Sequence, residues 1–286
     1  MNKMSKRVAD ESVLFTITKV LTHPALRYVG GRCIKSIFYN FFFLQYKAAL
    51  MPGRIPVSSV DHPLDPKIPF TPKWVDIYLD FIPFWLRSLG FFLRTYPRTG
   101  LEGAADFIAS MARVYTAAAE VYVKHLSTTD RPQYLANPRF VLIHAFDPHL
   151  MCIPSLHVMV VIRTYTQFRE LIRSMGDAER FAPQIEELKQ GALRITEAIL
   201  YVKQHSINCV AAAMYAMTRF DPPLFTPEEA KDFVSQLFIN AEIPAIEDAK
   251  ALGDYMLERY TRFLEEGTRA DAWEAPLLAF LQSRKD

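Results

Sequence analysis

Apolar side chains that recur at intervals of three and four residues are the feature that most constrains how this chain can fold. The pattern is clearest over residues 184–202, where the apolar positions are Ile185, Leu188, Ala192, Ile195, Ile199 and Val202. This spacing places them on one face of an α-helix. The polar residues Glu186, Lys189 and Gln190 fall on the opposite face. We therefore predict a helix here that continues as far as Met217.

The same reasoning predicts helices along most of the chain. The expected segments are 12–50, 73–95, 101–126, 155–175, 230–239, 245–266 and 271–282. Breaks are expected within the first of them, near His23–Pro24 and Gly30–Gly31, because proline and glycine interrupt helices. No run alternates apolar and polar residues over the length of a convincing strand. We predict an all-α fold, a helical bundle.

Proline marks two boundaries along the chain. Residues 51–72 contain six prolines and are predicted to form a connector. A second boundary is expected near Asp221-Pro222-Pro223, because Thr226-Pro227-Glu228-Glu229 then has the form of a helix capping box. The predicted organisation is N-terminal helices packing on the core over 1–100, a core over 101–220 and an amphipathic helical extension over 221–286.

Composition excludes several classes of protein. The formal net charge of +2 gives no strong basic field, so nucleic acid is not an expected partner. The three cysteines, Cys33, Cys152 and Cys209, form neither a disulfide framework nor a zinc-binding spacing. A secretory signal peptide is not expected, because Asp10 and Glu11 interrupt the N-terminal segment.

Charges interrupt the longest apolar stretches. No stretch of 18 apolar residues is free of charge, and the best candidates, 77–93 and 195–217, each contain an acidic and a basic residue. A charge at the centre of a bilayer costs roughly 2.5–3.5 kcal/mol. We expect a membrane-associated protein that adheres to the surface or embeds only some of its helices. A soluble cytoplasmic form is the alternative.

Three short segments carry residue types suited to phosphate chemistry. They are Lys124-x6-Arg131-Pro132, Pro154-Ser155-Leu156-His157 and Lys203-Gln204-His205. An arginine offers a planar fork of donors for two phosphate oxygens, and a lysine offers a point charge. Histidine serves as a nucleophile or as a general acid and base. Each segment alone is commonly structural, but their order and spacing together point to a single site.

In order and spacing, the segments resemble the type 2 phosphatidic acid phosphatase superfamily, which includes vanadium haloperoxidases and inositol phosphorylceramide synthases. The family pattern is Lys-x6-Arg-Pro, then Pro-Ser-Gly-His, then Ser-Arg-x5-His-x3-Asp. The chain matches the first part at every fixed position. Leu156 in the second part, and Asp147-Pro148-His149 before it, are similar to the lipid phosphotransferase branch. The resemblance covers residues 120–217 and implies a helical bundle of the acid phosphatase/haloperoxidase type.

The resemblance also implies a role for each site residue. His205 is the nucleophile that forms a phosphohistidine. His157 protonates the leaving oxygen and then activates water or an acceptor alcohol. The implied phosphate ligands are Lys124, Arg131, Lys203 and the backbone N–H groups of Ser155 and Leu156 at the start of a helix. Neither a metal nor another cofactor is required.

The chain departs from the family pattern at two places. Ala198 and Ile199 stand where the family has Ser-Arg, and Lys203 is expected to supply the missing charge. Cys209 stands where the family has the Asp that orients the nucleophilic histidine. On a continuous helix, residues 205 and 209 would share one face, so Cys209 is a candidate catalytic residue. Asp147 and Glu197 are the other carboxylates considered for that role.

The function expected from these residues is a phosphatase or phosphotransferase that acts on a lipid phosphate or a small phosphomonoester. The leading alternative is a catalytically degenerate relative that binds a phosphate or a lipid headgroup without turnover. Cys209 and the missing Ser-Arg pair favour this alternative. A purely structural helical protein is the third hypothesis.

Overall fold

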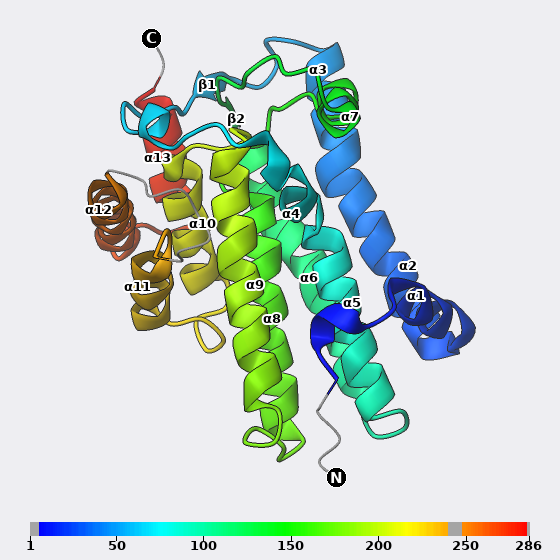
Figure 1. Cartoon of the computed structure of the whole chain (residues 1–286). Coiled ribbons are helices and arrows are strands. Elements are labelled where there is room, and N and C mark those ends of the chain that lie inside the picture. Colours follow the sequence, from blue (N-terminus) through cyan, green and yellow to red (C-terminus); the bar gives the residue numbers. More distant parts are fainter. Residues whose placement is uncertain (1–5, 240–247, 285–286) are drawn as a thin grey trace.

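The computed structural model describes residues 6–239 and 248–284, which form the predominantly helical molecule of Figure 1. The longer helices are α2 (Pro24–Ile37), α5 (Phe81–Thr95), α6 (Leu101–Tyr122), α8 (Leu156–Ser174), α9 (Ala182–Tyr201), α10 (Ile207–Phe220) and α12 (Ala249–Gly267). The shorter helices are α1 (Val13–Thr22), α3 (Leu44–Leu50), α4 (Val75–Leu79), α7 (Pro138–Phe146), α11 (Pro227–Gln236) and α13 (Ala275–Gln282). A π-helical segment, Phe38–Phe43, joins α2 to α3, and two short strands, β1 (Val57–Ser59) and β2 (Leu126–Thr128), pair in parallel. The predicted all-α character is confirmed.

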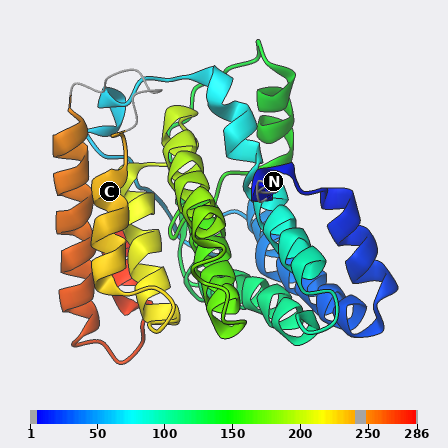
Figure 2. The same ribbon diagram turned by 60° about the horizontal axis from the view of Figure 1, so that its bottom comes forward.

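Helix α8 forms the centre of the bundle. It packs against α5, α6, α9 and α10. The run Val158–Ile162 is apolar throughout, and its side chains are fully buried. A helix with neighbours on several sides needs such an all-round apolar surface, whereas α9 keeps one polar face. The N-terminal helices and the C-terminal helices lie on opposite sides of α8 and α9 (Figure 2).

The N-terminal arm, which we define as residues 13–50, runs along one side of the molecule (Figure 1). Within it, α2 packs along α6, and α1 packs against α5. The crossing of α1 and α5 depends on Gly90, because a Cβ atom there would lie 2.1 Å from Oγ1 of Thr16. That hydroxyl donates to the backbone carbonyl of Leu86 at 2.9 Å. The arm is therefore fixed to the bundle at both α1 and α2.

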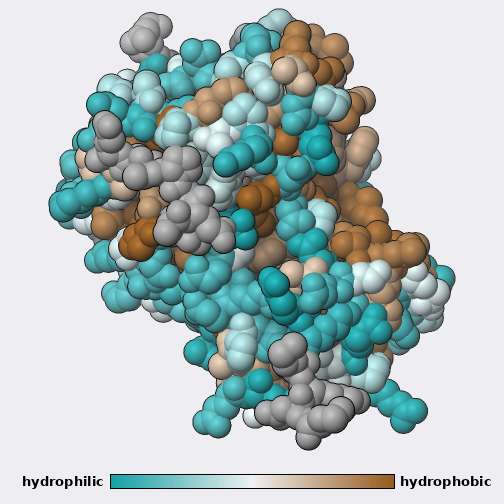
Figure 3. All heavy atoms as spheres, in the orientation of Figure 1, coloured by the Kyte–Doolittle hydropathy of each residue, from teal (hydrophilic) through white to brown (hydrophobic). Residues whose placement is uncertain are grey.

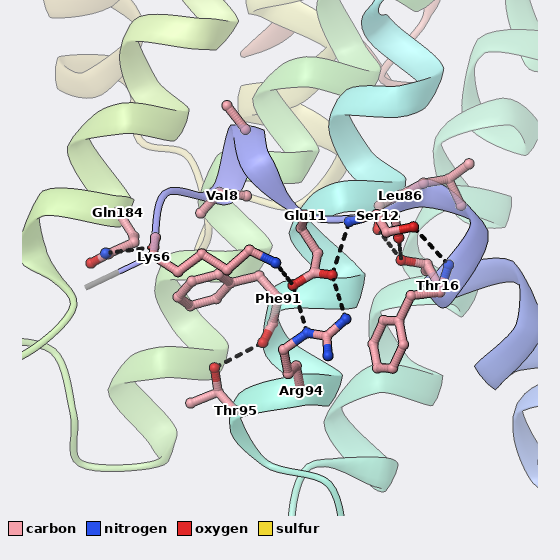
Figure 4. A network of polar contacts seen from close by, with 12 residues as sticks. Lys6, Val8, Glu11, Ser12, Thr16, Leu86, Phe91, Arg94, Thr95 and Gln184 are labelled. Carbon is pink, nitrogen blue, oxygen red and sulfur yellow. Dashed lines mark hydrogen bonds and ion pairs between the residues drawn. The ribbon is translucent and has the colours of Figure 1, made fainter. Parts of the chain in front are cut away.

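A buried carboxylate fixes the segment before α1 (Figure 4). The side chain of Glu11 has no exposed surface and accepts hydrogen bonds from Arg94 Nη2 at 2.8 Å and from Lys6 Nζ at 3.0 Å. Burial favours the neutral acid, but these two cations and the Ser12 N–H outweigh it and lower the pKa of Glu11 to about 2. The ion cluster ties the start of α1 to α5.

One continuous cluster of buried apolar side chains extends through all three predicted regions, from Val8 to Leu281. In the C-terminal region, α12 packs against α10, α11 and α13. The predicted capping box is confirmed: the hydroxyl of Thr226 accepts from the N–H of Glu229, and the Glu229 carboxylate accepts from the N–H of Thr226. The regions 1–100, 101–220 and 221–286 thus pack around a shared core in the described part of the chain.

The continuous helix predicted over 184–217 is wrong. Helix α9 ends at Tyr201 and α10 begins at Ile207. Between them, Lys203 has a left-handed backbone with φ 55°, which is uncommon for a residue other than glycine, and Ser206 caps the start of α10. Apolar residues on both sides of this break are buried, so their periodicity gave no sign of it. His205 therefore lies in a loop.

Other predicted boundaries had mixed outcomes. The break at His23–Pro24 is confirmed, since it separates α1 from α2, whereas the break at Gly30–Gly31 is wrong because α2 runs through both residues. The helix predicted over 73–95 is divided at Asp80 into α4 and α5. Helix α7 was not predicted. The start of the helix predicted over 245–266 lies outside the described residues, and its described part is α12.

The two stretches considered as membrane spans are each divided between helices. Residues 77–93 lie over α4 and α5, and residues 195–217 lie over α9 and α10. Within residues 6–239 and 248–284, no helix has the combined length and apolar character needed to cross a membrane.

Candidate functional site

A small cavity of about 50 Å³ lies at the N-terminal end of α8. Segments far apart in the sequence form its walls. The lining residues are Phe41, Gln45, Tyr78, Phe81, Tyr115, Asp147, His149, Met151, Cys152, Leu156, His157, Gln204 and His205. The second and third predicted motif segments therefore meet in one place.

The two histidines predicted to be catalytic contact each other in this cavity. Nε2 of His205 lies 3.4 Å from Nδ1 of His157 and 3.4 Å from Oγ of Ser155. His157 belongs to the first turn of α8, and its ring stacks on Tyr78 with centroids 4.6 Å apart. Phe81 covers it from a second side, with a centroid separation of 4.2 Å. The aromatic rings hold His157 in place, while the loop between α9 and α10 presents His205.

Burial is the main cause of a low pKa for both histidines. It lowers the pKa of His157 to about 3, and the neighbouring His205 adds to the effect. It also lowers the pKa of His205 to about 3, with a further contribution from His149. Both rings are therefore neutral at neutral pH. A neutral imidazole keeps the lone pair that a nucleophile needs.

Arg131 links the loop that carries His205 to the loop that precedes α8. Its Nη1 donates to Oε1 of Gln204 at 3.2 Å, and its Nη2 donates to the backbone carbonyl of Asp147 at 2.8 Å. Its side chain is mostly buried, with 12% exposed. Gln204 and Asp147 both line the cavity, so the guanidinium lies just behind the cavity wall. The structure thus joins Arg131 to the two loops, although Arg131 itself, like the two lysines, does not line the cavity.

The two predicted lysines do not line the cavity. Nζ of Lys124 donates to Oε1 of Glu274 at 2.6 Å, and half of the Lys124 side chain is exposed. Nζ of Lys203 donates to the backbone carbonyl of Asp65. Each cation is engaged with a segment that does not line the cavity, which sequence spacing could not reveal. Their expected role as phosphate ligands is not supported by this placement.

The start of α8 is placed as predicted for Ser155 and Leu156. Ser155 immediately precedes the helix and Leu156 is its first residue, and no side chain caps this end. Leu156 and His157 line the cavity, so the positive end of the helix dipole adjoins it. The first N–H groups of a helix are suitable donors for an anion.

Cys209 lies in the first turn of α10 and is fully buried. Its thiol interacts with the sulfur of Cys152, and no hydrogen bond joins it to His205 in the described part of the chain. Burial is the main cause that raises the pKa of Cys209, which remains a neutral thiol. The expectation that residues 205 and 209 share a helix face is wrong, because His205 lies in the loop before α10.

Within the described residues, no carboxylate hydrogen-bonds His205 in the way that the resemblance assigns to an Asp. Nδ1 of His205 is buried and makes no hydrogen bond of normal geometry. Glu197 accepts instead from the N–H of Phe238 at 2.6 Å, and burial raises its pKa to about 7. The backbone carbonyl of Cys152 raises the pKa of His205, but burial has the larger effect and lowers it.

A further polar cluster on the cavity wall was not predicted from the sequence. His149 has a left-handed backbone, with φ 60°, and its Nε2 lies 2.7 Å from Oγ1 of Thr129 and 3.7 Å from Sγ of Cys152. Its Nδ1 lies 3.6 Å from Oδ2 of Asp147. Burial opposes the charged form, but Cys152 and Asp147 raise the pKa of His149 to about 9. His149 is therefore a cation beside the two neutral histidines.

Metal binding finds no support in this arrangement. Across the described ranges, no group of three or more His, Cys, Asp or Glu residues is arranged to hold a metal ion.

Comparison of the chain with protein-family models, with curated proteins and with solved structures found no match in any of the three. The function is therefore inferred from the residues of the site.

Proposed function

We propose that this chain is a phosphatase or phosphotransferase that forms a phosphohistidine on His205. One observation carries the proposal: Nε2 of His205 lies 3.4 Å from both Nδ1 of His157 and Oγ of Ser155, in a cavity at the start of α8. A neutral nucleophile, a second imidazole and a helix N-terminus are the groups that transfer of a phosphoryl group requires. The substrate is a lipid phosphate or a small phosphomonoester.

In the first step, the lone pair on Nε2 of His205 forms a bond to phosphorus, and the bond from phosphorus to the ester oxygen breaks. The leaving oxygen takes a proton from His157. In the second step, the oxygen of water or of an acceptor alcohol forms a bond to phosphorus, the bond from phosphorus to Nε2 of His205 breaks, and His157 accepts the proton of the attacking group. Positive charge near the equatorial oxygens comes from the start of α8, from Arg131 and from the His149 cation.

Proton supply sets a condition on this mechanism. The pKa of His157 is lowered to about 3, mainly by burial, so at neutral pH the ring holds no extra proton. A phosphomonoester monoanion carries its own proton, since the second pKa of phosphate monoesters is about 6. A bound anion also favours the protonated form of His157. We infer that the substrate delivers the proton that His157 passes to the leaving group.

Space sets a second condition. A phosphorus atom bonded to Nε2 of His205, with an ester oxygen beyond it, needs more room than the 3.4 Å that separates the two rings. His157 is held between Tyr78 and Phe81, whereas His205 lies in a loop. The loop between α9 and α10 must therefore shift when a substrate enters, and the contact between the histidines is exchanged for contacts with phosphate.

A second candidate function is binding of a phosphate or headgroup without turnover. It is favoured by the absence of a normal hydrogen bond at Nδ1 of His205 and by the distance of Lys124 from the cavity wall. In serine proteases, replacing the aspartate that orients the catalytic histidine lowers kcat by about 10⁴.

Steady-state turnover of a generic phosphomonoester separates the two functions. We expect measurable hydrolysis by the full chain, and loss of at least about 100-fold in His205→Gln and in His157→Gln. Phosphate binding by the same proteins, followed by NMR, is the control. Binding without turnover in the unaltered chain would contradict the enzyme and favour the second function.

A further inference from the structure

The N-terminal arm has an unusual charge composition. No acidic residue occurs between Glu11 and Asp61, although the whole chain contains 31 acidic and 33 basic residues. The basic residues in this interval are Lys19, Arg27, Arg32, Lys35, Lys47 and Arg54. The arm is therefore a region of one sign of charge on an otherwise balanced molecule. Its preferred surface is an anionic one.

The same arm bears most of the exposed large apolar side chains of the described residues. On α2, the π-helical segment and α3 these are Tyr28, Ile34, Phe38, Tyr39, Phe42, Phe43, Tyr46 and Leu50. Leu14 and Leu21 extend the surface onto α1, and Leu142 and Phe146 extend it onto α7. Figure 3 shows hydrophobic residues gathered along the side of the molecule formed by the arm and α7. Exposed apolar surfaces of this extent mark interaction sites.

Basic and aromatic side chains lie next to one another along the outer side of the arm. Tyr28, Arg32, Lys35 and Tyr39 line an open hollow on α2. Arg32 lies 5.9 Å from the ring of Tyr28, and Lys35 lies 6.0 Å from the ring of Tyr39. The spacing of three and four residues places them on a single helix face. We call this surface, from Tyr28 to Leu50, the aromatic–basic stripe.

We propose that the aromatic–basic stripe docks on the surface of an anionic lipid bilayer. A helix that lies in the interface buries apolar and aromatic side chains at the level of the headgroups and turns its Lys and Arg towards the phosphates. Tyrosine is enriched at that depth because its ring is apolar and its hydroxyl is polar. Juxtamembrane cations add an attraction to anionic lipids that salt screens. The stripe combines these requirements with no acidic residue to oppose them.

The opposite side of the arm lines the cavity at the start of α8. Phe41 and Gln45 form part of the cavity wall, and Oε1 of Gln45 accepts from the N–H of Leu150 at 3.3 Å. Tyr46 donates to the backbone carbonyl of Phe146 at 2.6 Å, which fixes α7 to the arm. Docking through the stripe therefore places the cavity one helix away from the lipid surface.

Vesicle sedimentation with the full chain tests the docking. The probes are vesicles of phosphatidylcholine alone and of phosphatidylcholine with about one-third phosphatidylglycerol. We expect binding to the anionic vesicles that weakens as salt is raised. The double variant Arg32→Glu/Lys35→Glu is expected to lower the partition coefficient at least about tenfold. The matched control reverses two exposed cations away from the arm, Arg173→Glu/Lys231→Glu, and is expected to bind like the unaltered chain.

A second pair of measurements guards against misfolded variants and against a different occupant of the surface. Phe42→Ser/Phe43→Ser is expected to weaken binding in proportion to lost apolar contact while the melting temperature is kept. Equal binding by the stripe variant and the control variant would overturn the proposal. So would sedimentation velocity showing a dimer of the unaltered chain that the stripe variants dissociate, because the stripe would then join two copies.

Discussion

A tight loop, and not a hydrogen bond to a carboxylate, positions the imidazole of His205. The left-handed Lys203 turns the chain out of α9, and Ser206 starts α10 immediately afterwards. The backbone of this loop thus positions His205, and the backbone carbonyl of Cys152 raises the pKa of its ring. Cys209, which stands where the resembled family has an orienting Asp, interacts with Cys152. Orientation of His205 is therefore a property of the loop.

Replacing Cys209 by Asp tests this account of the loop. Since Cys209 is fully buried and contacts Cys152, the new carboxylate would lie beside a sulfur and away from His205. We expect no gain in kcat/KM, and a loss of unfolding free energy of at least about 2 kcal/mol from burial of an unpaired polar group. Urea denaturation and a phosphatase assay measure the two effects. A gain in activity would show that residue 209 does orient His205.

The two cations of the first motif are expected to differ in function. Arg131 lies behind the cavity wall, held by Gln204 and Asp147, whereas Lys124 is half exposed and pairs with Glu274. Arg131→Met is expected to lower kcat/KM by about 100-fold or more, because positive charge beside the phosphate is lost. Lys124→Met is expected to keep kcat/KM within about twofold, because the ammonium of Lys124 pairs with Glu274 and does not line the cavity. Equal losses of kcat/KM in both variants would show that Lys124 also acts at the site.

The sequence allowed the pairing of His157 with His205 to be predicted, because each lies in a motif of recognisable order. It did not allow the contact of His149 with Asp147 and Cys152 to be predicted. That cluster depends on the left-handed backbone of His149, and a histidine two residues from an aspartate has no distinctive pattern. The partners of Lys124 and Lys203 were also missed, because Glu274 and Asp65 are distant in the sequence.

At the level of elements, apolar periodicity identified most helices but not where they end. It predicted α6 and α8 nearly to their observed bounds, since each is long and buried. It joined α9 to α10 because the apolar positions continue on both sides of the break. Gly30 and Gly31 were read as a break, yet both lie inside α2, which packs along α6. The contacts between α2 and α6 outweigh the tendency of glycine to interrupt a helix.

Helix packing at Gly90 gives a prediction with a matched control. Gly90→Ala would place a methyl group against Thr16 and force α1 away from α5, so we expect a loss of about 1–3 kcal/mol in unfolding free energy. Gly253 lies in α12, and a methyl group added there would meet no neighbouring atom within 4 Å, so Gly253→Ala is expected to stabilise by up to about 1 kcal/mol. Thermal or urea unfolding measures both. A neutral Gly90→Ala would show that the α1–α5 crossing is loose.

At the scale of the whole molecule, one core joins the arm, the central helices and the C-terminal helices. The cavity lies where the arm meets the start of α8, and it is walled from both. The aromatic–basic stripe faces outward from the same arm. The arm thus contributes both to the proposed docking surface and to the wall of the candidate site.

The two histidines of the cavity make the stability of the whole molecule dependent on pH. Both have a pKa of about 3 in the folded chain against an ordinary value near 6.5. The unfolded chain therefore binds more protons between those values, and stability falls as the pH falls through that window. The loss is up to about 2 kcal/mol per histidine at about pH 5. In His157→Gln/His205→Gln, denaturant unfolding at several pH values should show a flatter dependence, and an unchanged slope would contradict the low pKa values.

The central claim, transfer of a phosphoryl group through His205, is tested most directly by trapping the intermediate. The full chain is mixed with a phosphomonoester, quenched in alkali to preserve phosphohistidine, digested and analysed by mass spectrometry. We predict one phosphoryl group on the peptide that contains His205, absent from His205→Gln and persisting longer in His157→Gln, which lacks the base for the second step. Turnover without a label on His205, or a label that survives in His205→Gln, would contradict the claim.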